Sequence, residues 1–285
     1  MLRQFPLPIV IEGLAKDCAA TELWSPDLFK EKYGDFEVCV DNTYALGSSN
    51  SRATLAEIVD EIQLGTTGGR YVQNISNLFL EYPELEQQLP LTKIKACLPD
   101  TSRLFGIQLF LGGSDTGSHY HCAKGVNFFV NVFGEKEWTF VSPHHSVWMY
   151  PKMHVTGIHF MSAVDYRKTP AEQQETFPLY SQVPIFKAHL RAGDVLINVP
   201  WWWHAIKNLT PITIACSTRW GVPNVKRTNP LYATCGNLSP HILTKVSKEF
   251  LLNPNARMRD EMFRDVYHKD YENYHRFRHE QKVKR

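Results

Sequence analysis

The chain has 285 residues, of which 43% are hydrophobic, and a formal net charge of +2. This length and apolar content suffice for one large globular domain or two small ones. The near balance of acidic and basic residues gives no signal for a nucleic-acid or membrane-surface partner. Prolines interrupt the first ten residues, and no apolar run approaches the ~20 residues that span a bilayer. We therefore expect a soluble intracellular protein, cytoplasmic or nuclear.

The first hundred residues mix short strands with capped helices. The apolar run 8–13 predicts a strand that enters the domain, and the alternating run 36–40 predicts another. Ser25 followed by Pro26 predicts a helix that begins there and ends at Gly34. Thr54 with Glu57 three residues later forms a capping box, which predicts a helix that ends near Gly65.

The stretch from Leu104 to Trp220 is rich in Ile, Val, Phe, Thr and Trp, with turn residues between the runs. Eight short strands separated in this way favour a barrel or a sandwich. We expect Phe133–Lys136 to turn a hairpin. The expected strands are 104–111, 117–122, 126–133, 136–141, 185–190, 194–199, 203–208 and 211–219.

Two segments lie outside this β-rich core. The polar stretch 151–184 has the length of a lid or a binding loop. After Pro240 the apolar residues recur at helical spacing, so we divide the chain into a β domain, 1–239, and a C-terminal helical extension, 240–285. The stripe of Ile242, Val246 and Phe250 needs a cover, which either a second copy in a homodimer or the same chain would supply.

Six scattered cysteines show no C-x-x-C spacing, which is typical neither of a zinc ribbon nor of a disulfide framework. The histidines are more informative. His119 and His121 lie two residues apart in a predicted strand, so both imidazoles project from the same face. His204 follows an apolar strand, a proline and three tryptophans. These three histidines are candidate metal ligands, although spacing alone leaves open that they are buried and hydrogen-bonded instead.

Several motifs occur in an order that resembles the JmjC or cupin-like oxygenase family. They are Thr116-Gly-Ser-His-Tyr-His121, the run from Asn127 to Pro143, and Gly193-Asp-Val-Leu-Ile-Asn-Val-Pro-Trp-Trp-Trp-His204. The start of the chain is also similar to the start of such domains, so the resemblance covers roughly residues 5–222. It implies a mainly β fold with flanking helices, built on a double-stranded β-helix core. It also implies Fe(II) bound by an H-x-D/E…H triad, with 2-oxoglutarate as co-substrate.

The resemblance assigns roles to individual residues. His119 matches the first metal ligand and His204 the last. Lys136 matches the lysine that pairs with the distal carboxylate of 2-oxoglutarate, for which an ammonium is a suitable point-charge partner. Thr116 matches a hydroxyl that binds the same carboxylate, and Asn127 matches a polar residue near the co-substrate.

His121 departs from the family pattern, which has Asp or Glu at this position. A neutral imidazole there raises the net charge of the site by one unit. The site then either keeps Fe(II) and the dianionic 2-oxoglutarate, or resembles three-His dioxygenases that work without it, or prefers zinc or copper. Halogenation is disfavoured, because a bulky ligating side chain does not open a position for halide. Thr116 and Lys136 favour retention of 2-oxoglutarate.

The expected function is an Fe(II)/2-oxoglutarate-dependent oxygenase that hydroxylates, or demethylates through hydroxylation, a protein, peptide or small-molecule substrate. Two alternatives stay open at this point. One is a three-His metal dioxygenase independent of 2-oxoglutarate. The other is a non-catalytic JmjC-like module that uses the barrel to bind a protein or ligand, with the metal structural or absent.

Overall fold

A computed structural model describes residues 7–44, 51–123, 125–153 and 159–222. The predicted C-terminal helices therefore lie outside the described residues. Helices are short and strands predominate. The helices are α1 Ala19–Leu23, α2 Pro26–Tyr33, α3 Leu55–Gln63, α4 Leu78–Glu81, α5 Glu84–Gln87 and α6 Leu91–Ala96, with 3-10 turns η1 Pro143–Met149, η2 Ala171–Gln173 and η3 Pro178–Gln182. The strands are β1 Ile9–Ile11, β2 Glu37–Asn42, β3 Ser51–Thr54, β4 Arg70–Ile75, β5 Arg103–Gly113, β6 Gly117–Ala123, β7 Val126–Phe133, β8 Lys136–Val141, β9 Pro151–Met153, β10 His159–Ser162, β11 Phe186–Leu190, β12 Val195–Asn198, β13 Trp203–Asn208 and β14 Ile212–Gly221.

The strands form two antiparallel sheets that face each other as a flattened barrel. The larger sheet has the order β1-β12-β7-β14-β5-β4-β2-β3, and the smaller has the order β11-β8-β13-β6-β10-β9. Consecutive strands alternate between the sheets along much of the chain, which is the double-stranded β-helix that the sequence predicts. All eight strands expected between residues 104 and 219 are present, with ends shifted by at most two residues.

The turn at Phe133–Lys136 corrects one expectation, because it does not close a hairpin. β7 pairs with β12 and β14 in the larger sheet, whereas β8 pairs with β11 and β13 in the smaller one. Gly134, at φ 72°, supplies the left-handed backbone that lets the chain cross from one sheet to the other. Lys136 consequently begins a strand that faces the barrel interior and is not an exposed hairpin residue.

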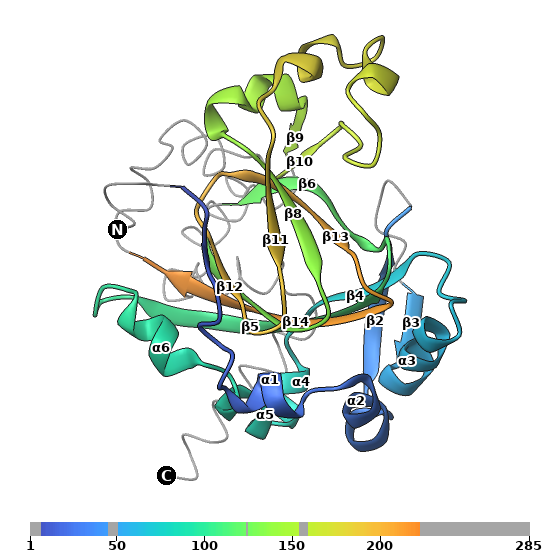
Figure 1. The fold of residues 1–285 in the computed structure, drawn as a ribbon, viewed down its shortest axis with the longest axis vertical. Helices are drawn as coiled ribbons and strands as arrows, with labels where there is room; N and C mark the ends of the chain where they lie inside the picture. Colours follow the sequence, from blue (N-terminus) through green and yellow to red (C-terminus); the bar gives the residue numbers. More distant parts are fainter. Residues whose placement is uncertain (1–6, 45–50, 124, 154–158, 223–285) are drawn as a thin grey trace, which may run out of the picture.

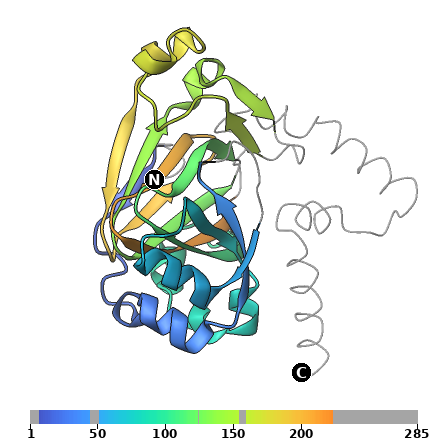
Figure 2. The ribbon, with the colours of Figure 1, turned by 90° about the vertical axis from the view of Figure 1, so that its right-hand side faces the viewer.

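The helices and the insertion between β8 and β11 cover different sides of the barrel. Figures 1 and 2 show α1–α6 packed against the larger sheet, with residues 142–153 and 159–185 at the opposite end of the molecule. The expected caps are present: Ser25 accepts from the backbone N–H of Leu28, and Thr54 with Glu57 forms the complete capping box. Within the described chain, none of the helices has the length and apolar character that a membrane crossing requires.

Two separate apolar clusters follow from the alternation of side chains along the strands. The main cluster includes Phe110, Phe129 and Trp138 between the sheets and the residues beneath the helices. The second cluster lies between the outer face of the smaller sheet and the insertion, and contains Tyr120, Cys122, Met149, Phe160, Tyr180, Trp201 and Trp203. The insertion is therefore a folded cover with a core of its own. Cys122 follows His121 on β6, and its side chain lies on the opposite face of the strand, in this cluster.

Gly117 allows the close approach of β6 and β13 that shapes the site. A Cβ built at Gly117 would lie 1.8 Å from the carbonyl oxygen of Ile206, whereas a Cβ at Gly106 would meet nothing within 4 Å. We expect Gly117→Ala to force the strands apart and to lower the free energy of unfolding by about 1–3 kcal/mol. Gly106→Ala is the control and should be neutral or slightly stabilising. Urea denaturation of both variants measures the difference, and equal midpoints would contradict the argument.

Candidate metal and co-substrate site

The interior face of the smaller sheet carries the candidate site in ordered rows. Lys136, Trp138 and Phe140 alternate along one face of β8, and they pair across the sheet with Asn208, Ile206 and His204 of β13. His204 in turn pairs with His121 of β6. The histidine pair thus lies at one end of these strands and Lys136 at the other. Four residues of strand separate the rows of His204 and Lys136, or roughly 13 Å.

His121 and His204 form a close pair of neutral imidazoles. Their ring centroids are 4.1 Å apart. Burial lowers the pKa of His121 to about 4. The pKa of His204 is also lowered, mainly by burial and to a smaller extent by the nearby His121. Trp138 stacks on the His204 ring at a centroid distance of 5.4 Å. Trp138 is therefore the tryptophan that contacts His204 on the interior face of the sheet. Trp201 and Trp203, which precede His204 in the chain, pack on the outer face of the sheet.

Backbone carbonyls fix which nitrogen of each ring carries the proton. Nδ1 of His121 lies 2.8 Å from the carbonyl oxygen of His119, and Nδ1 of His204 lies 2.9 Å from that of Trp202. A carbonyl only accepts, so both Nδ1 atoms donate and both Nε2 atoms keep a lone pair. The side-chain nitrogen of Asn198 lies 3.2 Å from Nε2 of His204. Because this Nε2 can only accept, the amide of Asn198 donates to its lone pair and would have to turn away before a metal binds there.

His119 is arranged differently. Its Nε2 donates to the carbonyl oxygen of Thr43 at 2.8 Å, which leaves the lone pair on Nδ1. That Nδ1 atom is buried and has no hydrogen-bond partner. Burial lowers the pKa of His119, and the positive charge of Arg167 lowers it further. Three neutral imidazoles with one lone pair each suit Fe, Zn, Cu or Ni, so the donor set fits a metal ion.

The described residues nevertheless do not contain three His, Cys, Asp or Glu side chains already assembled as metal ligands. His121 and His204 face each other directly, whereas the His119 ring is engaged by Thr43. The structure thus brings two of the three predicted ligands together. His119 lies two residues before His121 on β6 and therefore on the same face of that strand.

Lys136 is fully buried and bonded to neutral groups. Its ammonium donates to Oδ1 of Asn208 at 2.5 Å and to Oγ1 of Thr213 at 2.9 Å. It also lies 5.7 Å and 5.9 Å from the ring centroids of Tyr71 and Phe129. Burial lowers the pKa of Lys136 to about 7, because none of these contacts supplies a negative charge.

The two other predicted co-substrate residues lie in this interior as well. Asn208 donates to Oγ1 of Thr116 at 2.8 Å, so it links Thr116 to Lys136. The hydroxyl proton of Thr116 is engaged by the carbonyl of Gly113 at 2.7 Å, and it must turn away before it can bind a ligand. Asn127 is buried, accepts from Oγ of Ser217 at 2.6 Å, and pairs across the strands with Asn198 beside His204.

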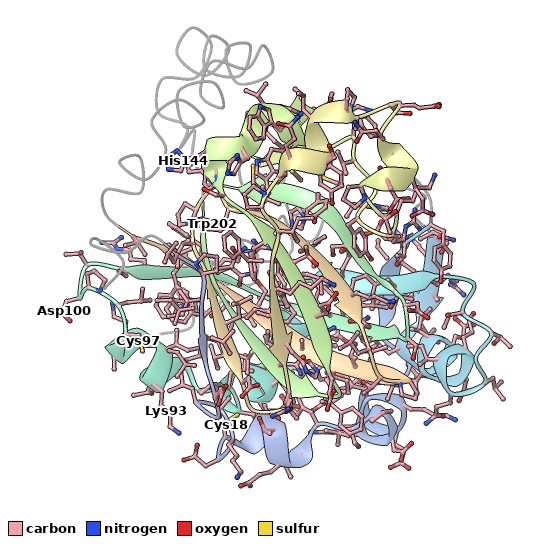
Figure 3. The ribbon with its side chains drawn as sticks, turned by 45° about the horizontal axis from the view of Figure 1, so that its top comes forward. Cys18, Lys93, Cys97, Asp100, His144 and Trp202 are labelled. Carbon is pink, nitrogen blue, oxygen red and sulfur yellow. The ribbon has the colours of Figure 1, made fainter. Side chains whose placement is uncertain are left out.

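The other histidines whose side chains are described lie away from this interior. His144 is exposed at the outer edge of the insertion (Figure 3), as expected for a surface turn. The side chains of His154 and His159 lie outside the described residues. Arg219 donates from Nε to Gln108 at 2.8 Å, and its positive charge contributes to the lowered pKa of both His121 and His204.

Comparison with known proteins agrees with this architecture. The model of the cupin-like domain family matches residues 5–222. The chain belongs to the cupin-like domain family. It is 26% identical over 211 residues to "Lysine-specific demethylase 8" of Xenopus tropicalis, which covers 71% of this chain and 45% of that protein. It is 28% identical over 104 residues to "JmjC domain-containing protein D" of Dictyostelium discoideum, covering 36% and 22%.

A third relative is "HSPB1-associated protein 1 homolog" of Danio rerio, 23% identical over 96 residues that cover 33% of this chain and 20% of that protein. The matched part of this chain thus spans less than half the length of each of these relatives. The JmjC-named relatives and the family match confirm the JmjC or cupin-like resemblance that the motifs indicated.

Sequence reasoning missed several residues that shape this cupin-like site. Asn208 and Thr213 hold Lys136, Trp138 stacks on His204, and Thr43 holds His119. Tyr71 is fully buried beside Lys136, and its hydroxyl has no hydrogen-bond partner. The alternation of β8 places Trp138 on the face of Lys136 and was a signal that could have been used. The others depend on contacts between distant strands.

The histidine pair predicts an acid-sensitive fold. An unfolded histidine has a pKa near 6.5, whereas that of buried His121 is about 4, so the unfolded chain binds more protons between these values. The metal-free protein should therefore lose stability as the pH falls from 6.5 to 4. His121→Asn should flatten this dependence, and the exposed control His144→Asn should not. Urea midpoints measured across this pH range, with chelator present, test the prediction.

Lys136 predicts a pH dependence of the same sign at higher pH. The pKa of an unfolded lysine is 10.5, so the unfolded chain binds more protons between pH 7 and 10.5, and stability rises with pH there. Lys136→Met removes the buried ammonium, and the loss of hydrogen bonds at Asn208 and Thr213 offsets part of the gain. We expect a net rise of about 1–3 kcal/mol in the free energy of unfolding at pH 7.

The matched control is Lys187→Met on β11, where the side chain is 61% exposed and pairs with Glu137. It should change stability by less than about 1 kcal/mol. Denaturant titrations at pH 7 and pH 9 distinguish the two variants. A ligand-free Lys136→Met protein that is less stable than wild type at both pH values would show that burial of the ammonium does not destabilise the fold.

Proposed function

We propose that this protein is an Fe(II)/2-oxoglutarate-dependent oxygenase of the hydroxylase type. The observation that carries the proposal is Lys136, a fully buried ammonium whose contacts are all neutral. A buried charge is costly unless an opposite charge balances it. An anion bound beside Lys136 would restore that balance, and 2-oxoglutarate is the anion that the JmjC or cupin-like family resemblance supplies.

His119, His121 and His204 would hold the metal. When bound, iron and 2-oxoglutarate supply the oxidation of a C–H bond by O2, with release of succinate and CO2. The carbonyls of His119 and Trp202 keep the lone pairs of His121 and His204 on Nε2, and the Asn198 amide, which donates to Nε2 of His204, would turn away when the metal binds. Metal binding by all three rings would use the free lone pair of His119, or would require that ring to release Thr43.

The protein side of the co-substrate site has three parts. Lys136 binds the distal carboxylate, and Asn208 orients both Lys136 and Thr116. Asn127 lies one strand from Asn198 and is placed to bind the end of the co-substrate nearer the histidines. The rings of Phe129, Trp138 and Phe140 line the interior between these ends and exclude water, which strengthens each electrostatic contact.

His121 in place of a carboxylate favours a dianionic co-substrate. Three neutral imidazoles leave the full charge of a divalent metal uncompensated, and Lys136 adds one more positive charge when protonated. A dianion neutralises much of that excess. The presence of Lys136 at the other end of the barrel argues against a dioxygenase that works without 2-oxoglutarate.

The non-catalytic module remains a second candidate, because one observation favours it. The His119 ring is hydrogen-bonded to Thr43, and no complete set of metal ligands is assembled among the described residues. In that case the barrel would bind an anionic ligand at Lys136 without oxidising a substrate.

Turnover of 2-oxoglutarate tests the proposal. The full chain, loaded anaerobically with Fe(II) and then exposed to O2, should release succinate only when 2-oxoglutarate is present. His119→Ala should abolish this release, and Lys136→Ala should raise the KM for 2-oxoglutarate at least about tenfold, since it removes a charged hydrogen bond. Lys187→Ala is the exposed control and should leave both values unchanged.

Three outcomes separate the candidates. Absence of succinate under every iron condition would overturn the oxygenase, and binding of 2-oxoglutarate without turnover would favour the non-catalytic module. Oxygen consumption that is independent of 2-oxoglutarate and unaffected by Lys136→Ala would favour the three-His dioxygenase.

A further inference from the structure

The insertion brings a tyrosine to the first histidine of the candidate site. The ring of Tyr166 meets the ring of His119 edge to face, with centroids 5.8 Å apart and planes at 80°. It meets Tyr120 in the same manner at 6.2 Å. The hydroxyl oxygen of Tyr166 is buried and has no hydrogen-bond partner. A buried hydroxyl in this state costs free energy, which a bound ligand that accepts its proton would recover.

A tight network holds the turn that carries Tyr166. The side-chain amide of Gln173 accepts from the backbone N–H of Asp165 at 2.8 Å and donates to the carbonyl of the same residue at 2.8 Å. Arg167 forms an ion pair with Asp165 at 2.8 Å and donates to the carbonyl of Thr43 at 3.2 Å. That carbonyl is also the partner of His119. The position of Tyr166 relative to His119 is therefore fixed from both sides.

Tyr166 is not the only hydroxyl in this state. The hydroxyl of Tyr71 is also buried and without a partner, and the Tyr71 ring lies beside the ammonium of Lys136. Burial raises the pKa of both phenols. Both remain protonated donors at neutral pH, and neither these hydroxyls nor Lys136 has an anionic partner among the described residues.

We propose that the hydroxyl of Tyr166 donates a hydrogen bond to an oxygen of the anionic co-substrate, so that the insertion completes the co-substrate site. This inference rests on the proposed function and adds a binding residue from outside the barrel strands. The ligand class is a 2-oxo dicarboxylate, whose oxygens accept from Lys136 at one end of the site and from Tyr166 near His119. The apolar cluster beneath the insertion then serves to hold Tyr166 in place.

Substitution by phenylalanine isolates the hydroxyl. Tyr166→Phe keeps the ring contacts with His119 and Tyr120 and removes only the unpartnered group. The control is Tyr180→Phe, which removes a buried hydroxyl whose partner is the hydroxyl of Tyr120 in the cluster beneath the insertion. The full chain loaded with Mn(II) is titrated with 2-oxoglutarate by calorimetry, and each protein is also titrated with Mn(II) alone. Melting temperatures are recorded without ligand.

Tyr166→Phe should weaken 2-oxoglutarate binding about tenfold, since it removes a hydrogen bond to a charged group. Its affinity for Mn(II) alone should stay within twofold of wild type. Its melting temperature without ligand should be unchanged or higher, because an unsatisfied hydroxyl has been removed. Tyr180→Phe should bind 2-oxoglutarate as wild type does.

Three results would overturn the inference. Unchanged 2-oxoglutarate affinity in Tyr166→Phe, with normal binding by wild type, rejects the role of Tyr166 and leaves the proposed function intact. Equal weakening of Mn(II) and 2-oxoglutarate binding indicates that the hydroxyl supports the fold of the metal site instead. Absence of 2-oxoglutarate binding by wild type rejects this inference together with the proposed function.

Discussion

The buried ammonium of Lys136 is the constraint around which the barrel interior is organised. Its two hydrogen bonds reach Asn208 in the smaller sheet and Thr213 in the larger one, so a single cation ties the two sheets together at one end of the barrel. Its lowered pKa shows that neutral partners do not fully replace water. The end of the barrel at Lys136 is thus suited to an anion, and the opposite end of the same strands carries the imidazoles.

The two ends differ in how they prepare for a ligand. At the histidine end, backbone carbonyls set the tautomers of His121 and His204 before any metal arrives, and burial keeps both rings neutral. At the lysine end, the buried ammonium of Lys136 contacts only neutral groups. Preparation of this kind costs stability in the free protein and lowers the cost of ordering the site when a ligand binds. Under the proposed function, the site trades stability of the fold for affinity.

The insertion extends this principle beyond the barrel. It has its own apolar cluster against the outer face of the smaller sheet, and β10 extends that sheet by pairing with the strand that carries His119 and His121. Its turn at Asp165–Arg167 reaches around to the carbonyl of Thr43, which also binds His119. The insertion, the β2 end and the first histidine thus meet at one backbone oxygen. A change in any of them reaches the candidate metal site directly.

Between residues 104 and 219 the sequence by itself determined eight strands, because alternation of apolar residues and turn signals is local information, but it did not reveal β9 and β10 in the insertion. It also determined the capped helices at Pro26 and Leu55, and the family motifs pointed to His119, His204 and Lys136. Only the tertiary structure decided that Phe133–Lys136 crosses between sheets, since pairing partners depend on distant strands. It alone revealed Asn208, Thr213, Thr43 and Tyr166, whose contacts with Lys136 or His119 span 47 to 77 residues of chain. Local patterns predict which residues face inward, but which inward residues meet is set by how the two sheets close.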